Sequence, residues 1–122
     1  MKLYIGDLEK KAQKLLGNNI HMLRLMKRLS QKDVATSLLK SPNAVSNWEL
    51  GNTSPSIDDL LKLCDLFEVT PNQILGWENC QELDDFINET RSLAPKIEEL
   101  KKQKKEIDQQ LRIFDEIMNR KN

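Results

Sequence analysis

The chain has 122 residues, and its 19 basic and 19 acidic side chains give a net charge of zero at pH 7. The sequence pI of 6.6 excludes a protein that binds polyanions through bulk positive charge. The length suits one compact domain with an appendage, and the short apolar start is too brief for a signal peptide or a membrane span. We therefore expect a cytoplasmic protein.

The charge is distributed unevenly. Residues 1–77 hold ten basic and eight acidic side chains, a net charge of +2, whereas residues 78–122 hold nine and eleven, a net charge of −2. The two cysteines, Cys64 and Cys80, have neither the spacing nor the histidine partners of a metal site. We expect free thiols in a reducing compartment, with no metal and no cofactor.

The first predicted element is a helical stretch that begins near Asp7, a suitable N-cap, and continues to about residue 28. Ile20 and Leu23 lie on its inward side. The sequence Gly17-Asn18-Asn19 interrupts it and allows either a separate short helix or one long helix with a weak point. We favour a break or kink at Gly17. The single histidine, His21, has no partner nearby in the sequence and is expected to be a surface or boundary residue.

Residues 30–51 contain two short helical patterns separated by a tight break. Ser30 and Asp33 form a capping-box pattern at the first start, and Ser41 followed by Pro42 marks the second. The inward positions of the two helices are apolar, and Gly51 ends the second; these positions are Val34, Ala35, Leu38, Ala44, Val45 and Trp48. This pattern is typical of a helix-turn-helix.

The motif S-Q-x-D-V-A-x-x-L…S-x-x-x-V-S-x-W-E-x-G resembles the phage-repressor/Cro family of helix-turn-helix domains, also called the XRE family. The resemblance implies an all-α fold, with a five-helix lambda-repressor-like DNA-binding domain over residues 16–77 and an N-terminal extension over residues 1–15. The family usually has glycine and then a β-branched residue in the turn, where this chain has Leu39 and Lys40. Because leucine is unfavourable at positive φ, we expect a turn of different shape.

The resemblance also implies the residues that meet double-stranded DNA. The second helix of the motif, residues 42–49, would lie in the major groove and read base edges with Pro42, Asn43, Ala44, Ser46 and Asn47. Gln31 matches a family position that contacts a phosphate. Lys40, Ser41, Asn52 and Thr53 flank the motif, so we expect further phosphate contacts from them. Arg24 matches the position that pairs with the glutamate closing this helix, here Glu49. The pair would fix the orientation of the helix, or would simply stabilise the domain.

After a polar loop, Ser56 caps a further helix with a broad apolar face, made of Ile57, Leu60, Leu61, Leu63, Cys64 and Phe67. Thr70 and Gln73 then form another capping box, with Pro71 at the first helical position, and open one last short helix that ends at Gly76.

Residues 78–122 form a helical segment with a coiled-coil-type seam. Pro95 divides it into predicted helices over residues 81–93 and 95–120. Apolar residues recur there at alternating spacings of three and four, interrupted only by Thr90 and Lys104; they are Leu83, Phe86, Leu93, Ile97, Leu100, Ile107, Leu111, Phe114 and Met118. A hairpin folded onto the chain's own domain is one interpretation. We favour self-association, most simply as a homodimer, while a tetramer or a seam for another protein stays open.

These features predict a sequence-specific transcriptional regulator, namely a repressor of phage or mobile-element type that binds an inverted-repeat operator as a dimer. An antirepressor or another protein partner could control it. The alternative is an antitoxin-like or antagonist protein whose C-terminal helix sequesters a partner. No catalytic constellation is visible in the sequence, so we expect no enzymatic activity.

Overall fold

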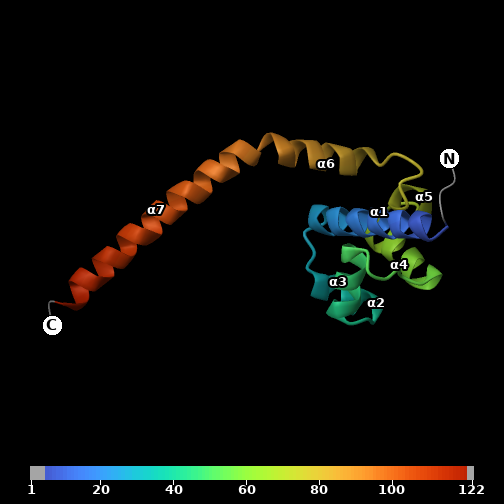
Figure 1. Ribbon diagram of the computed structural model, residues 1–122, viewed down its shortest axis with the longest axis horizontal. Coiled ribbons are helices and arrows are strands. Elements are labelled where there is room, and N and C mark those ends of the chain that lie inside the picture. Colours follow the sequence, from blue (N-terminus) through green and yellow to red (C-terminus); the bar gives the residue numbers. More distant parts are fainter. Residues whose placement is uncertain (1–4, 121–122) are drawn as a thin grey trace. The chain divides into compact units, whose positions relative to one another are not determined.

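The computed structural model describes residues 5–120 and contains only helices there (Figure 1). In chain order they are α1 (Ile5–Met26), α2 (Gln31–Leu38), α3 (Pro42–Leu50), α4 (Ile57–Phe67), α5 (Pro71–Ile74), α6 (Gln81–Ser92) and α7 (Ala94–Asn119). The chain separates into two compact units, Met1–Phe86 and Ile87–Asn122. Across the described residues, no helix is both long and apolar enough to cross a membrane.

Helix α1 runs without interruption through Gly17, so the expected break or kink is wrong. Gly17 is buried where α1 crosses the C-terminal end of α3. A β-carbon at this position would overlap the backbone carbonyl oxygens of Trp48 and Glu49. The glycine therefore serves the close approach of two helices, and the packing that it allows outweighs its poor intrinsic helix propensity.

The core of the first unit lies between α1 and the four shorter helices, with α1 and α2 both packed against α3. Its buried apolar side chains are Leu16, Ile20, Leu23, Val34, Ala35, Leu38, Val45, Trp48, Leu63, Cys64, Phe67, Ile74 and Leu83. The inward positions predicted for α2 are confirmed, as are Val45 and Trp48 in α3. In α4 the predicted apolar face is too broad, because Ile57 is 77% and Leu61 is 51% exposed.

Hydroxyl caps begin the short helices, as the sequence predicts. Thr70 and Gln73 form a reciprocal capping box, in which Gln73 N donates to Thr70 Oγ1 at 3.1 Å and Thr70 N donates to Gln73 Oε1 at 3.0 Å. Ser56 Oγ accepts from Asp59 N at 3.1 Å at the start of α4. Each cap satisfies a backbone N–H that has no partner within its own helix, so these local bonds fix where α4 and α5 begin.

The second unit contains the end of α6 and the 26-residue helix α7, which starts at Ala94, one residue before the predicted start at Pro95. Every side chain of α7 is exposed within the single chain. Leu83, which the sequence assigns to the seam, is instead buried in the first unit with 7% exposure. The exposed part of the seam therefore belongs to α7 and the residue before it, from Leu93 to Met118.

Candidate nucleic-acid interface

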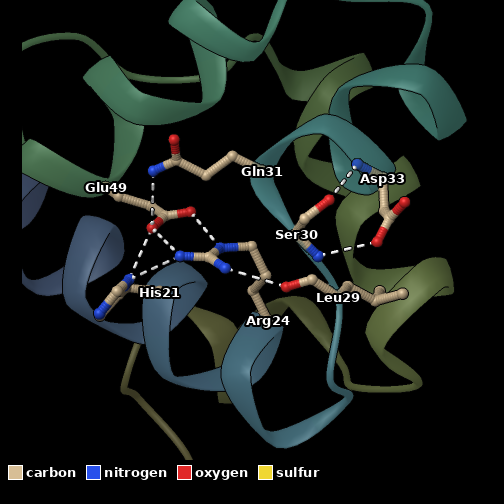
Figure 2. A network of polar contacts seen from close by, with 7 residues as sticks. All are labelled: His21, Arg24, Leu29, Ser30, Gln31, Asp33 and Glu49. Carbon is tan, nitrogen blue, oxygen red and sulfur yellow. Dashed lines mark hydrogen bonds and ion pairs between the residues drawn. The ribbon is translucent and has the colours of Figure 1, made fainter. Parts of the chain in front are cut away.

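Local hydrogen bonds fix the start of each helix in the motif. Asp33 N donates to Ser30 Oγ at 3.0 Å, and Ser30 N donates to Asp33 Oδ2 at 2.9 Å, which completes the predicted capping box of α2 (Figure 2). The backbone N–H and then the hydroxyl of Ser30 lower the pKa of Asp33. At the start of α3, Ser41 Oγ accepts from Ala44 N at 3.1 Å. The Ser41 hydroxyl hydrogen is not used in that bond, so it can still be donated to a phosphate.

The turn between the two helices has the left-handed conformation that glycine would adopt. Leu39 has φ 58° and ψ 42°, and its side chain is 89% exposed. The N–H of Lys40 donates to the carbonyl of Ala35 at 2.8 Å, which closes the end of α2. The expectation of a turn of different shape is therefore wrong, because these C-terminal hydrogen bonds hold Leu39 at positive φ despite its side chain.

The carboxylate of Glu49 is the meeting point of three helices (Figure 2). Arg24 on α1 donates from Nε to Oε2 at 2.7 Å and from Nη2 to Oε1 at 2.9 Å, a bidentate ion pair. Gln31 at the start of α2 donates from Nε2 to Oε1 at 3.3 Å. Arg24 also donates from Nη1 to the carbonyl of Leu29 at 2.9 Å. Thus one carboxylate joins α1, α2 and the end of α3.

His21 also belongs to this cluster, so the expectation that it stands alone is wrong. Its Nδ1 lies 2.6 Å from Glu49 Oε1 and 3.1 Å from Arg24 Nη2. Because an ionised carboxylate only accepts, Nδ1 donates to Glu49 in the tautomer that carries the proton on Nδ1. The two residues are 28 positions apart in the chain, and no local sequence pattern indicates the contact. The His21 side chain is only partly buried, whereas that of Glu49 is buried.

The ionisation of this cluster is strongly biased towards the charged pair. Burial opposes ionisation of Glu49, whose side chain is 5% exposed, but hydrogen bonds from Arg24, His21 and Gln31 outweigh burial and lower its pKa. The hydrogen bond to Glu49 raises the pKa of Arg24. An ion pair of this kind holds the end of α3 against α1 in a fixed orientation.

The exposed side of α3 carries the residues predicted to read bases. Val45 and Trp48 are buried, Pro42 and Asn43 are exposed, and Ala44, Ser46 and Asn47 are half-buried. Asn47 is tied to the loop that follows the helix, because Asn52 Nδ2 donates to its Oδ1 at 3.3 Å and the N–H groups of Asn52 and Thr53 donate to its carbonyl. The Asn47 side-chain NH₂ is not used in these bonds, so it is available as a donor to a base.

Lys40 has a partner within the protein. Its Nζ lies 3.3 Å from Oδ2 of Asp59, a carboxylate of α4 whose side chain is 7% exposed. The ammonium group neutralises a buried charge and holds the turn against α4. A phosphate contact by Lys40, which stays a prediction, would have to share the ammonium with Asp59.

A lysine-rich groove beside the motif was not predicted. Lys10, Lys11 and Lys14 of α1 line it, together with Asp7 and Gln13 of the same helix and with Gly51 and Asn52, which follow α3. The spacing i, i+1, i+4 places the three lysines on one side of a helix, and that pattern was present in the sequence. Three lysines against one carboxylate, in a groove that also includes Asn52, a predicted phosphate contact, make this groove suitable for an anion.

Comparison with known proteins agrees with this geometry. A helix-turn-helix family model matches residues 20–74. The chain is 33% identical over 88 residues to the HTH-type transcriptional regulator ImmR of Bacillus subtilis (strain 168), an alignment that covers 70% of this chain and 68% of that protein. It is also 33% identical over 78 residues to the HTH-type transcriptional activator BcrR of Enterococcus faecalis, covering 64% of this chain and 37% of that protein. The chain belongs to the XRE-type helix-turn-helix family of DNA-binding transcriptional regulators.

Proposed function

We propose that the protein is a dimeric repressor of phage or mobile-element type, which recognises an inverted-repeat operator by inserting α3 into the major groove. The observation that carries this proposal is the anchored α3. Glu49 fixes the end of the helix through Arg24, and Pro42, Asn43, Ser46 and Asn47 remain at its surface. A helix fixed by buried groups can present its outward amides without reorganisation, which is what base readout requires.

The two asparagines are the proposed specificity residues. An Asn side chain can donate to N7-edge acceptors and accept from the exocyclic amine of adenine, whereas the outward face of α3 has no arginine for guanine. Gln31, Ser41, Asn52 and Thr53 would hold the DNA backbone. We add Lys10, Lys11 and Lys14 to these phosphate contacts because they line the groove beside Asn52. Replacing these three lysines by glutamine should lower the salt dependence of binding by about one unit of slope per lost contact.

Dimerisation is part of the proposal because a single motif reads few base pairs and residues 1–77 carry a net charge of only +2. The exposed apolar side chains of α7, with Leu100 at 52% and Leu111 at 55% exposure, support self-association. A second copy would double the number of base and phosphate contacts in one binding event.

The test begins with selection of binding sites from a random DNA pool by the full chain, followed by mobility-shift titration with selected and scrambled duplexes. Each lost bidentate contact costs about 1–3 kcal/mol of discrimination. The double variant Asn43→Ala, Asn47→Ala should therefore lose at least tenfold in preference for the selected site and keep its thermal unfolding midpoint. Asn88→Ala, an exposed helical asparagine of α6, is the matched control and should retain the preference. Unchanged discrimination in the double variant would refute the assigned reading face.

A further inference from the structure

We propose that α7 associates with α7 of a second copy in the antiparallel direction, centred between Lys105 and Glu106. This inference deepens the dimer of the proposed function and depends on it. Three observations on α7 carry it: the pattern of the exposed seam, the separation of charge along the helix, and the identity of the residues that flank the seam.

The seam is symmetric about this centre. In an antiparallel pair the two helices run in opposite directions. The residue numbers of any two seam residues that face each other therefore add up to the same total. With the proposed centre, Ile97 faces Phe114, Leu100 faces Leu111 and Lys104 faces Ile107 of the second copy. All of these apolar side chains are at least 39% exposed in the single chain. Every seam layer of α7 except that of Lys104 is then apolar on both sides.

Charge is separated between the two halves of α7. The half from Ala94 to Lys105 has five lysines and two glutamates, a net charge of +3. The half from Glu106 to Asn119 has one arginine and four carboxylates, a net charge of −3. A parallel pair would place like halves side by side, whereas an antiparallel pair places each basic half beside an acidic one. The helix macrodipoles also favour the antiparallel arrangement.

The residues that flank the seam also favour the antiparallel pair over the parallel one. In a parallel pair, Lys96 would face Lys101 of the other copy, and the two Lys104 side chains would meet inside the seam. In the antiparallel pair, Lys101 and Asp108 of the other copy flank the same edge of the seam, offset by two positions from direct opposition, and symmetry supplies this attraction twice. The two Lys104 side chains are then in separate layers. Each of these differences disfavours the parallel dimer.

The antiparallel arrangement fixes the distance between the starts of the two α7 helices. The two Ala94 residues, where α7 begins in each copy, would lie about 35 Å apart along the pair. This value is close to the separation of half-sites by one turn of B-DNA, about 34–36 Å.

Charge exchange in the full chain tests the orientation, with the dimer dissociation constant measured by sedimentation in the absence of DNA. Lys101→Glu and Asp108→Lys each convert two attractions per dimer into repulsions, and each should raise the dissociation constant about tenfold. The double variant Lys101→Glu, Asp108→Lys should return to within about threefold of the parent, since the exchanged charges attract again. Lys102→Glu makes the same change in charge on the outward side of α7 and should leave the constant unchanged.

A double variant that remains as weak as the single variants would overturn the proposed orientation. A second measurement uses Ile97→Cys and Phe114→Cys proteins under mild oxidation, with crosslinked peptides identified by mass spectrometry. The mixture should form a 97–114 crosslink and Ile97→Cys alone none, whereas a 97–97 crosslink would establish the parallel pair. A full chain that stays monomeric would overturn both the orientation and the proposed dimer. Loss of sequence discrimination with an intact α7 pair would instead overturn only the assigned DNA-reading role.

Discussion

At the scale of single residues, two backbone positions go against ordinary sequence preference in opposite ways. Gly17 lies inside a long helix, where glycine is unfavourable, and Leu39 has a left-handed conformation, where glycine is preferred. The environment decides each case. Gly17 faces the backbone of α3, and Leu39 faces solvent.

Replacing Gly17 by alanine should destabilise the protein. In an exposed helix this change would stabilise by about 1 kcal/mol, but here the new methyl group overlaps two carbonyl oxygens of α3. We expect the free energy of unfolding to fall by about 2 kcal/mol, measured by urea titration. Asn18→Ala, at the exposed neighbouring position of α1, is the control and should be neutral or slightly stabilising. A stabilised Gly17→Ala protein would show that α1 and α3 do not approach this closely.

Replacing Leu39 by glycine should stabilise the protein. The left-handed conformation costs a non-glycine residue about 1–2 kcal/mol, and an 89% exposed leucine loses little buried surface when it is removed. We expect a gain of about 1 kcal/mol in the free energy of unfolding. Thr36→Gly, at an exposed position within α2, should show the opposite sign, with a loss of about 1 kcal/mol. Equal losses in the two variants would contradict the positive φ at Leu39.

At the scale of elements, the recognition helix depends on a carboxylate at its C-terminal end. Glu49 receives hydrogen bonds from α1 and α2, so the position of α3 is set by residues that come before it in the chain. The same contact makes the stability of the motif depend on pH.

Stability should decrease in acid because of Glu49. Its folded-state pKa lies below the ordinary value of 4.5, so its contribution is complete above that pH and is lost as the pH falls through the folded-state pKa. Glu49→Gln leaves Arg24 without its ion partner and should cost about 2–4 kcal/mol at pH 7. The difference between parent and variant should shrink below pH 4.5 in urea titrations. Glu68→Gln, which removes an 82% exposed partner of Lys27, should change stability by less than about 0.5 kcal/mol.

At the scale of the whole molecule, recognition and association are assigned to separate units. The first unit has its own apolar core, whereas α7 exposes all of its side chains within one chain. An exposed helix of this length gains most of its stability by covering its apolar side with another helix. We therefore expect the affinity for DNA to depend on protein concentration in the range where α7 associates.

Disrupting the apolar seam of α7 should prevent dimerisation and weaken DNA binding while the first unit stays folded. Leu100→Asp with Leu111→Asp places two charges in the predicted contact, and the full-length variant should be monomeric in sedimentation experiments. Its affinity for a selected inverted-repeat duplex should fall at least tenfold, while the thermal unfolding of the first unit stays unchanged. Gln109→Asp adds a charge on the outward side of α7 and serves as the control. Normal dimerisation and operator binding by the seam variant would instead favour a seam that serves another protein.

Local patterns were sufficient to predict most of the fold. Hydroxyl caps and prolines act within three or four residues, so the starts of α2, α3, α5 and α7 could be read from the sequence. Gly17 was misread because its reason is a tertiary contact with Trp48 and Glu49. The partner of His21 lies 28 residues away in the chain, so no local pattern indicates it. How much of the apolar face of α4 is buried depends on which other helices cover it, and this is also a tertiary property. The base-reading and phosphate assignments stay predictions, because they concern contacts with a second molecule.

Because α7 is a single uninterrupted helix, its length sets a fixed distance along the proposed pair. A helix rises by a constant amount per residue, so in an antiparallel pair the distance between the two Ala94 residues would depend only on the number of residues in α7. Each inserted heptad would lengthen that distance by about 10 Å, close to three base pairs of DNA. The separation of the two helix starts could then be changed through the length of one helix, without any change in the residues that are predicted to read the bases.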